Sequence, residues 1–395
     1  MRRSFRLVEP EDLADAVASP GSLTALGGRL RYTALQPTEP LSPDAACLVG
    51  TDALADRIRR EWAEANRPGH AMPAGVVVLE GLVALGRAGL LLDMAGHCLV
   101  GGLLSFGRGA ASVYLDGFAA EYRLDMAWSA DRTEFSLDLP ERMPRLPSPA
   151  TVMCGPGMGI YGHWLLDQVP RLHLLGLCEA EGIGRRLHTM LPPWSRPLAA
   201  ALARPGTTDE LIPTQPFRYL QRNLIPSGIR RVSAFSAPVC RQAWQALRHA
   251  LLAQPADAPK ATRLFVTRRH WARQGTEPGR TIGNVAALEA LAEQRGYLVL
   301  APETLSVPAQ ARLFDSARVV VGEDGSALHN ILFARPGAAL GVLGGAGRRN
   351  PWHLAMCREL GHRIGYVAAE PASGLIEPAA FAALLDQLEA VVSPA

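Results

Sequence analysis

The chain has 395 residues, of which 48% are hydrophobic and 19% charged, and its formal net charge is +3. This length is large for one hydrophobic core, so we expect two domains, and the composition excludes a disordered chain. The charge is small and no Lys/Arg block is longer than a pair, which argues against a nucleic-acid-binding protein.

The six cysteines are scattered and form no C-x-x-C pair. This favours reduced, buried thiols in the cytosol over a disulfide framework or a zinc site. Glu9 and Glu11 follow the basic start, so no apolar signal core is predicted, and charged residues interrupt the most apolar stretch, residues 74–104. We expect a cytoplasmic protein, which leaves room for peripheral association with the inner face of the membrane.

Residues 1–145 form the first predicted region. A helix is expected over residues 51–66, and short apolar runs separated by glycines between residues 75 and 132 predict a β-meander. Four prolines between residues 140 and 149 mark a boundary.

The second predicted region covers residues 146–255. A strand at 151–154 enters a glycine loop, and a helix at 163–172 is expected to kink or restart at Pro170. Further strand–helix alternation follows, and a helix over residues 238–254 leads into residues 253–260, which have the composition of a linker.

The third region, residues 256–395, alternates regularly between apolar strands and amphipathic helices. This alternation predicts a parallel sheet with right-handed crossovers. The predicted strands are 264–267, 297–300, 319–321 and 338–343, and the predicted helices are 284–294, 307–316 and 378–391.

Residues 318–342 carry the clearest pattern of this region. Val319–Val321 is typical of a strand buried on both faces. Gly322 and Gly325 are expected to let the backbone turn, and Ser326 to cap a helix. Ligands of open α/β sheets lie at the carboxyl ends of strands, and free N–H groups at a helix start bind anions. The pattern predicts a ligand site, although an ordinary βαβ unit has the same shape.

A group of arginines comes after the strand at residues 264–267. Arg268 and Arg269 follow it directly, and Arg280 comes twelve residues later. Arginine forms bidentate contacts with phosphate, so this group predicts a phosphate site, with a solvated basic loop as the alternative.

His163 and Asp167 are four residues apart on a predicted helix and therefore share a face. A carboxylate in that position orients an imidazole, and histidine is the usual general base for a hydroxyl proton. A packing or capping histidine would show the same spacing.

Two weaker patterns remain. Gly157-x-Gly159-x-x-Gly162 matches the dinucleotide fingerprint, with Glu179 and Glu181 about twenty residues further on, but a proline interrupts the helix that should follow. A simple glycine turn explains it better. The neighbouring acids Glu323 and Asp324 with His329 do not form a recognisable ligand set, so no metal site is predicted.

Taken together, these stretches resemble glycosyltransferase family 61, over roughly residues 159–343. Three motifs in order carry the resemblance. They are Tyr161-Gly-His163-Trp164-Leu-Leu-Asp167-Gln-Val-Pro170-Arg171, the pair Arg268-Arg269 followed by Arg280-Thr-Ile-x-Asn284, and Gln310-x-x-Leu313-Phe-x-x-Ala317 running through Val319–Gly322 into Gly325-x-x-Leu328-x-Asn330-x-x-Phe333-x-x-Pro336-Gly337.

The resemblance implies the GT-B fold, with two facing Rossmann-like domains, here preceded by a β-rich extension. It implies a glycosyltransferase of bacterial capsular-polysaccharide type that uses a nucleotide sugar as co-substrate, with inversion and without a cofactor or metal. The acceptor would be a glycan or a lipid-linked glycan. The predicted catalytic residues are His163 and Asp167, and the predicted donor-binding residues are Arg268, Arg269, Arg280, Asn284, Gly322, Asp324, Gly325, Ser326, His329 and Asn330.

One position departs from the family's pattern. Many members have G-x-H-G-A where this chain has Gly322-Glu-Asp324-Gly-Ser326, and an acid close to a diphosphate would repel it. Either His329 takes over the cationic role, or Asp324 contacts sugar or ribose hydroxyls. A non-catalytic binding protein and a nicotinamide-dependent oxidoreductase remain as alternatives, and the sequence leaves the sugar, the linkage and the oligomeric state open.

Overall fold

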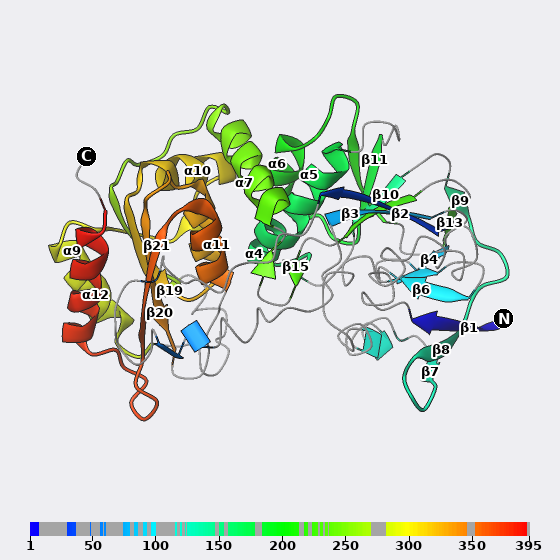
Figure 1. The fold of residues 1–395 in the computed structure, drawn as a ribbon, viewed down its shortest axis with the longest axis horizontal. Helices are drawn as coiled ribbons and strands as arrows, with labels where there is room; N and C mark the ends of the chain where they lie inside the picture. The colour runs from blue at the N-terminus through cyan, green and yellow to red at the C-terminus, as the bar shows by residue number, and fades with distance from the viewer. Residues whose placement is uncertain are drawn as a thin grey trace. The chain divides into compact units, whose positions relative to one another are not determined.

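A computed structural model shows a mixed α/β protein (Figure 1), which confirms the predicted α/β class. Two compact units are present, one formed by residues 1–40 and 68–243 and the other by residues 41–67 and 244–395. The structure describes residues 1–7, 30–36, 48, 56–57, 59–60, 74–79, 83–85, 90–92, 96–99, 115–116, 119–120, 123, 125–146, 150–153, 157–177, 184–212, 217–219, 223–227, 230–231, 234–235, 237–269, 282–345 and 352–392.

The first unit contains an eight-stranded sheet in the order β7-β8-β1-β6-β5-β4-β13-β9. Its strands are β1 (Arg2–Leu7), β4 (Val83–Leu85), β5 (Leu90–Leu92), β6 (His97–Leu99), β7 (Met126–Trp128), β8 (Glu134–Asp138), β9 (Arg145–Leu146) and β13 (Phe217–Tyr219). The antiparallel neighbours β4, β5 and β6 confirm part of the predicted meander. The predicted helix at residues 51–66 lies largely outside the described residues.

A six-stranded sheet of the same unit has the order β12-β11-β10-β14-β3-β2. Its strands are β2 (Leu30–Gln36), β3 (Ala74–Leu79), β10 (Ala150–Met153), β11 (Arg185–His188), β12 (Thr208–Leu211) and β14 (Asn223–Ser227), and a small ribbon is formed by β15 (Arg230–Arg231) and β16 (Ala234–Phe235). Strands β12, β11, β10 and β14 are parallel. The order reverses at β10, which lies between β11 and β14 and is therefore at a switch point.

The helices of this unit follow the parallel strands. They are α4 (Tyr161–His163), the π-helix η3 (Trp164–Gln168), α5 (Val169–Leu177), η5 (Pro193–Ser195) and α6 (Arg196–Ala201). Helix α7 (Ala237–Leu252) contains the division between the two units, at Ala243 and Trp244.

The second unit has a five-stranded sheet in which every pair is parallel, in the order β18-β17-β19-β20-β21. Its strands are β17 (Arg263–Val266), β18 (Leu298–Leu300), β19 (Val319–Glu323), β20 (Ala339–Gly344) and β21 (Arg363–Ala368). This is a doubly wound order whose switch point lies between β17 and β19. The parallel sheet predicted from the alternating pattern is confirmed.

Helices cover both faces of this sheet (Figure 1). Helices α9 (Val285–Gln294) and α12 (Pro378–Ala390) pack on one face, and α10 (Val307–Ser316), the 3₁₀ helix η7 (Ser326–Phe333) and α11 (Trp352–Leu360) lie on the other. A short 3₁₀ turn, η6 (Pro302–Thr304), precedes α10. Helix α10 has the predicted bounds, whereas α11 and β21 were not predicted.

Strand β19 is buried at all five positions, as its valines predicted. Val319 and Val321 join a core with Leu288 of α9 and Leu385 of α12, and Phe265 meets Phe381 edge to face at a centroid distance of 6.1 Å. Because both faces are covered, polar groups of this unit are directed to the strand ends.

The two glycines after Val321 have roles other than the predicted turn. Gly322 lies inside β19 opposite Val266, and a Cβ at Gly322 would be 2.4 Å from the carbonyl oxygen of Val266. Gly325 has extended backbone and is the N-cap of η7, so the prediction that Ser326 caps an α-helix is wrong. The first glycine therefore permits a close approach of two strands.

We expect Gly322→Ala to lower the melting temperature of the protein by several degrees. The added methyl group has to displace backbone, and overpacking of this kind costs about 1–3 kcal/mol. Gly176→Ala in α5 is the matched control, since a Cβ there meets nothing within 4 Å. The explanation fails if the two variants melt alike.

Candidate active site

His163 and Asp167 are brought together in the first unit. The Nδ1 atom of His163 lies 2.7 Å from Oδ2 of Asp167, and their side chains are 18% and 13% exposed. Both follow β10, at the switch point of the six-stranded sheet. The predicted pairing of an imidazole with a carboxylate is thus present, at a strand end where ligands of such sheets bind.

The loop before this helix is shaped around His163. Gly157 has a φ of +74°, and a Cβ there would lie 2.3 Å from Cγ of the His163 ring. A Cβ at Gly159 would lie 2.9 Å from the sulfur of Met190. These glycines therefore make room for neighbouring side chains of the protein, which favours the simple turn over a dinucleotide site. Glu179 and Glu181 lie outside the described residues.

The helix that carries the pair is widened to a π-helix at Trp164–Gln168, where the N–H of Val169 bonds to the carbonyl oxygen of Trp164. Pro170 lacks an N–H and would clash with the carbonyl four residues earlier in a regular α-helix. The wider turn relieves this conflict, so the irregularity predicted at Pro170 occurs in the turn before it. Single π turns inside helices are frequent at functional sites.

Trp164 anchors this helix in the core. It is fully buried, and its indole N–H donates to the carbonyl oxygen of Met158 at 2.7 Å. Its ring stacks on His188 with a centroid distance of 5.7 Å and meets Trp194 edge to face at 6.1 Å. The position of His163 is therefore fixed through its neighbour in sequence.

His188 is held in place by a buried network of charged side chains. Asp209 accepts hydrogen bonds from Nε of Arg186 at 2.8 Å and pairs with Nε2 of His188 at 2.6 Å. Burial lowers the pKa of His188. Burial alone would raise the pKa of Asp209, but the bonds from His188 and Arg186 hold it below its ordinary value. These three residues were not predicted, because their contact joins two neighbouring strands.

In the second unit, Arg268 bridges the carboxyl ends of β17 and β19. Its backbone N–H donates to Oε1 of Glu323 at 3.0 Å, and its Nη1 donates to the carbonyl oxygen of Asp324 at 3.1 Å. A Cβ at Gly325 would be 3.3 Å from Nε of Arg268. The arginine thus lies at the switch point of the sheet, beside the start of η7.

Asp324, predicted as a donor-binding residue, is bonded to a side chain that the sequence did not single out. Its Oδ1 atom lies 3.0 Å from Nε2 of His353 in α11, and the side chain of His353 is fully buried. The ring of His329 is also buried and lies 4.8 Å from that of His353, between centroids. The side chains of Asp324, His353 and His329 therefore lie together next to the carboxyl end of β19.

Two other predicted residues make contacts within the fold. The amide of Asn284 donates to the carbonyl oxygen of Ile376 at 2.7 Å and accepts its N–H at 3.0 Å. Asn330 donates to Gln310 at 2.8 Å. These bonds tie neighbouring elements together, and a donor-binding role for both asparagines stays a prediction.

The remaining arginines of the predicted phosphate site are placed differently. Arg269 forms an ion pair with Glu289 of α9, and its side chain is 56% exposed. Arg280 lies outside the described residues. Within the described ranges, no three His, Cys, Asp or Glu side chains are arranged to hold a metal ion.

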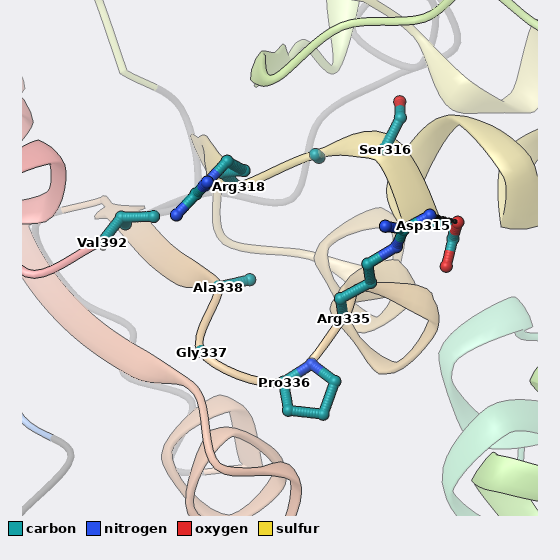
Figure 2. Close-up of a pocket in the computed structure, with 9 residues that line it drawn as sticks. Asp315, Ser316, Arg318, Arg335, Pro336, Gly337, Ala338 and Val392 are labelled. Carbon is teal, nitrogen blue, oxygen red and sulfur yellow. Dashed lines mark hydrogen bonds and ion pairs between the residues drawn. The ribbon is translucent and has the colours of Figure 1, made fainter. Parts of the chain in front are cut away.

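A pocket of about 460 Å³ opens at the amino-terminal ends of the strands of this sheet (Figure 2), next to the first residues of β19 and β20. Its charged residues include Asp315 and Arg335, which form an ion pair of 3.1 Å. Ligands of open α/β sheets lie at the carboxyl edge, so this pocket is on the wrong side for a donor site. Its lining residues are Asp315, Ser316, Ala317, Arg318, Arg335, Pro336, Gly337, Ala338 and Val392.

The fold and these contacts define an α/β protein with polar side chains at the carboxyl ends of parallel strands in two of its sheets. The model of the family Glycosyltransferase 61 matches residues 161–341, slightly under half of the chain. This stretch begins just before His163 and ends in β20, so it contains both parts of the candidate site. The match confirms the resemblance for this stretch and indicates a glycosyltransferase. No curated protein matches the chain.

Glu323 gives a pH-dependent test of the edge between β17 and β19. Burial raises the pKa of Glu323 above its ordinary value, against the opposing effect of the Arg268 N–H. A carboxyl group whose pKa is higher in the folded state stabilises the fold fully below its unfolded pKa, and this contribution is lost as the pH rises through the folded pKa.

We therefore expect Glu323→Gln to gain stability relative to the wild type between pH 4 and pH 8, because glutamine still accepts the N–H of Arg268 but cannot ionise. Melting temperatures across this range measure the difference. Glu293→Gln, at an exposed position of α9, corrects for the loss of one charge. A difference that does not change with pH would contradict the burial of an ionisable carboxyl group.

Proposed function

We propose that the protein transfers a sugar from a nucleotide-sugar donor to a hydroxyl group of a glycan or lipid-linked acceptor in surface or capsular polysaccharide synthesis. The observation that carries this proposal is the position of Arg268, at the switch point between β17 and β19 and inside the family match. The reaction proceeds with inversion and needs no metal ion or cofactor.

The donor's diphosphate binds at the carboxyl edge of β17 and β19. Arg268 supplies positive charge there, and Ser326 and Ala327 begin η7 two residues after β19, so their N–H groups belong to a helix start at the same edge. Arg280 adds a second cation. As the bond from the anomeric carbon to the diphosphate breaks, negative charge grows on the leaving oxygen, and these groups stabilise it in the transition state.

The acceptor hydroxyl is deprotonated by His163. With its Nδ1–H donated to Asp167, the imidazole uses Nε2 to take the proton while the acceptor oxygen bonds to the anomeric carbon. The nucleoside diphosphate leaves with the electron pair of the broken bond. Asp167 fixes the tautomer and stabilises the imidazolium that forms.

This activity places the protein in the bacterial cytoplasm, with association at the inner face of the membrane where lipid-linked acceptors are found. In the described part of the chain, no helix has the length and apolar character needed to cross a bilayer. The two-domain GT-B arrangement is part of the same proposal and follows from the family resemblance.

A second candidate is nucleotide or glycan binding without turnover. It is favoured by one observation, the carboxylate of Asp324 at the end of β19, where an anion would bind. The two candidates differ in the role of His163, because binding alone does not need a base.

For the donor site, we expect one nucleoside diphosphate from a panel of ADP, GDP, UDP and CDP to raise the melting temperature equally with and without Mg²⁺. A ligand that binds only the folded protein at 100 times its Kd adds about 2.7 kcal/mol. Arg268→Ala should abolish this shift, whereas Arg318→Ala, at the opposite sheet edge, should retain it. The donor site is refuted if no diphosphate shifts the wild type.

For the catalytic pair, we expect His163→Ala to reduce the release of the diphosphate from its nucleotide sugar by about 10²- to 10⁴-fold, the usual contribution of a general base. Binding of the nucleoside diphosphate should be unchanged. Asp167→Asn should show a smaller loss, and His249→Ala, exposed on α7, none. Turnover by His163→Ala at the wild-type rate would exclude the proposed base, and absence of turnover in every form would favour the binding protein.

A further inference from the structure

The acid at the end of β19 conflicts with an anion site unless its carboxylate is held away from the ligand. Asp324 follows β19 directly and is adjacent to Gly325, the N-cap of η7. A carboxylate close to a diphosphate repels it strongly, because the edge of a sheet is only partly solvated. The contacts of Asp324 therefore decide whether this edge can bind a nucleotide.

The backbone of Asp324 is held on both sides. Its N–H donates to the carbonyl oxygen of Leu343 in β20 at 2.8 Å, and its own carbonyl oxygen accepts Nη1 of Arg268 at 3.1 Å. Arg268 therefore reaches the backbone of this residue, while the carboxylate makes its contact elsewhere. The guanidinium group of Arg268 therefore does not form an ion pair with the carboxylate of Asp324.

The carboxylate is turned to α11. Its Oδ1 atom lies 3.0 Å from Nε2 of His353, and the exposed fraction is 11% for the acid and zero for the histidine. His353 is the second residue of α11, so the acid also lies close to a helix N-terminus, where negative charge is favourable. The second imidazole, that of His329, packs against His353 at 4.8 Å between centroids.

We propose that His353 is a positioning residue for donor binding, which holds the carboxylate of Asp324 on α11 through the contact at Nε2, so that the edge beside Arg268 accepts a diphosphate. This inference rests on the proposed function. Glu323 is a second acid at this edge, and its side chain accepts the backbone N–H of Arg268. His353 thus removes the conflict created by an acid at this position.

The test uses the nucleoside diphosphate that stabilises the wild type, with its Kd measured by calorimetry at pH 7.5. We expect His353→Leu to weaken binding by at least about tenfold, because the carboxylate loses its partner and is free to turn to the ligand. Asp324→Asn should bind more tightly than the wild type. The double variant should recover most of the lost affinity, since it has no carboxylate left to turn to the ligand.

A merely structural role of His353 predicts the opposite for the double variant, which would then bind as weakly as His353→Leu or more weakly. That result overturns the proposal, as does wild-type affinity in His353→Leu. If the leucine variant does not fold, His353→Phe replaces it, since phenylalanine keeps a ring in the same place but has no N–H donor, and Asp324→Asn should again restore its binding.

Arg268→Ala separates this inference from the proposed function. If the wild type binds the diphosphate and Arg268→Ala does not, the donor site stands, and the His353 variants alone decide on the positioning residue. If the wild type binds none of the diphosphates, both the donor site and the role of His353 are refuted.

Discussion

The close approach of β17 and β19 is the constraint on which the second unit depends. The two strands are in register from Arg263 and Val319 to Val266 and Gly322, and the last pair leaves no room for a Cβ. Because the strands end side by side, the residues that follow them share one edge. Arg268 can then bond to both Glu323 and Asp324 without a long loop. A single missing side chain thus sets the geometry of the candidate donor site.

The same arrangement occurs in the first unit. There the parallel strands have the order β12-β11-β10-β14, and His163 follows β10, the strand at which the order reverses. At such a point the connections from the two neighbouring strands run to opposite faces, which leaves a crevice above the strand end. Both predicted sites therefore lie at the switch point of their own sheet. One was predicted from a histidine after a glycine loop, and the other from an arginine pair after a strand.

The parts of the structure that the sequence predicted are those encoded by local patterns. The β-branched run at Val319–Val321 and the amphipathic period of α10 are visible within ten residues, so the parallel sheet could be derived. The eight-stranded sheet could only be predicted in part, because β1 pairs with β8 and β13 with β4 across long separations. The contact of Asp324 with His353 spans 29 residues and involves a helix that was not predicted. Such contacts depend on packing, which periodicity does not encode.

The glycine loop before His163 shows how a spacing can match a fingerprint for unrelated reasons. In a dinucleotide site the first two glycines permit a tight turn and the approach of a pyrophosphate. Here the left-handed φ of Gly157 also serves a turn, but the space beside it is filled by the imidazole of His163, and the space beside Gly159 by Met190. The imidazole and the left-handed φ require a glycine at position 157, whereas the neighbour of Gly159 is the flexible end of the half-exposed Met190. The first glycine of the spacing is therefore explained by packing against His163. The candidate catalytic groups at this loop are that histidine and its partner Asp167.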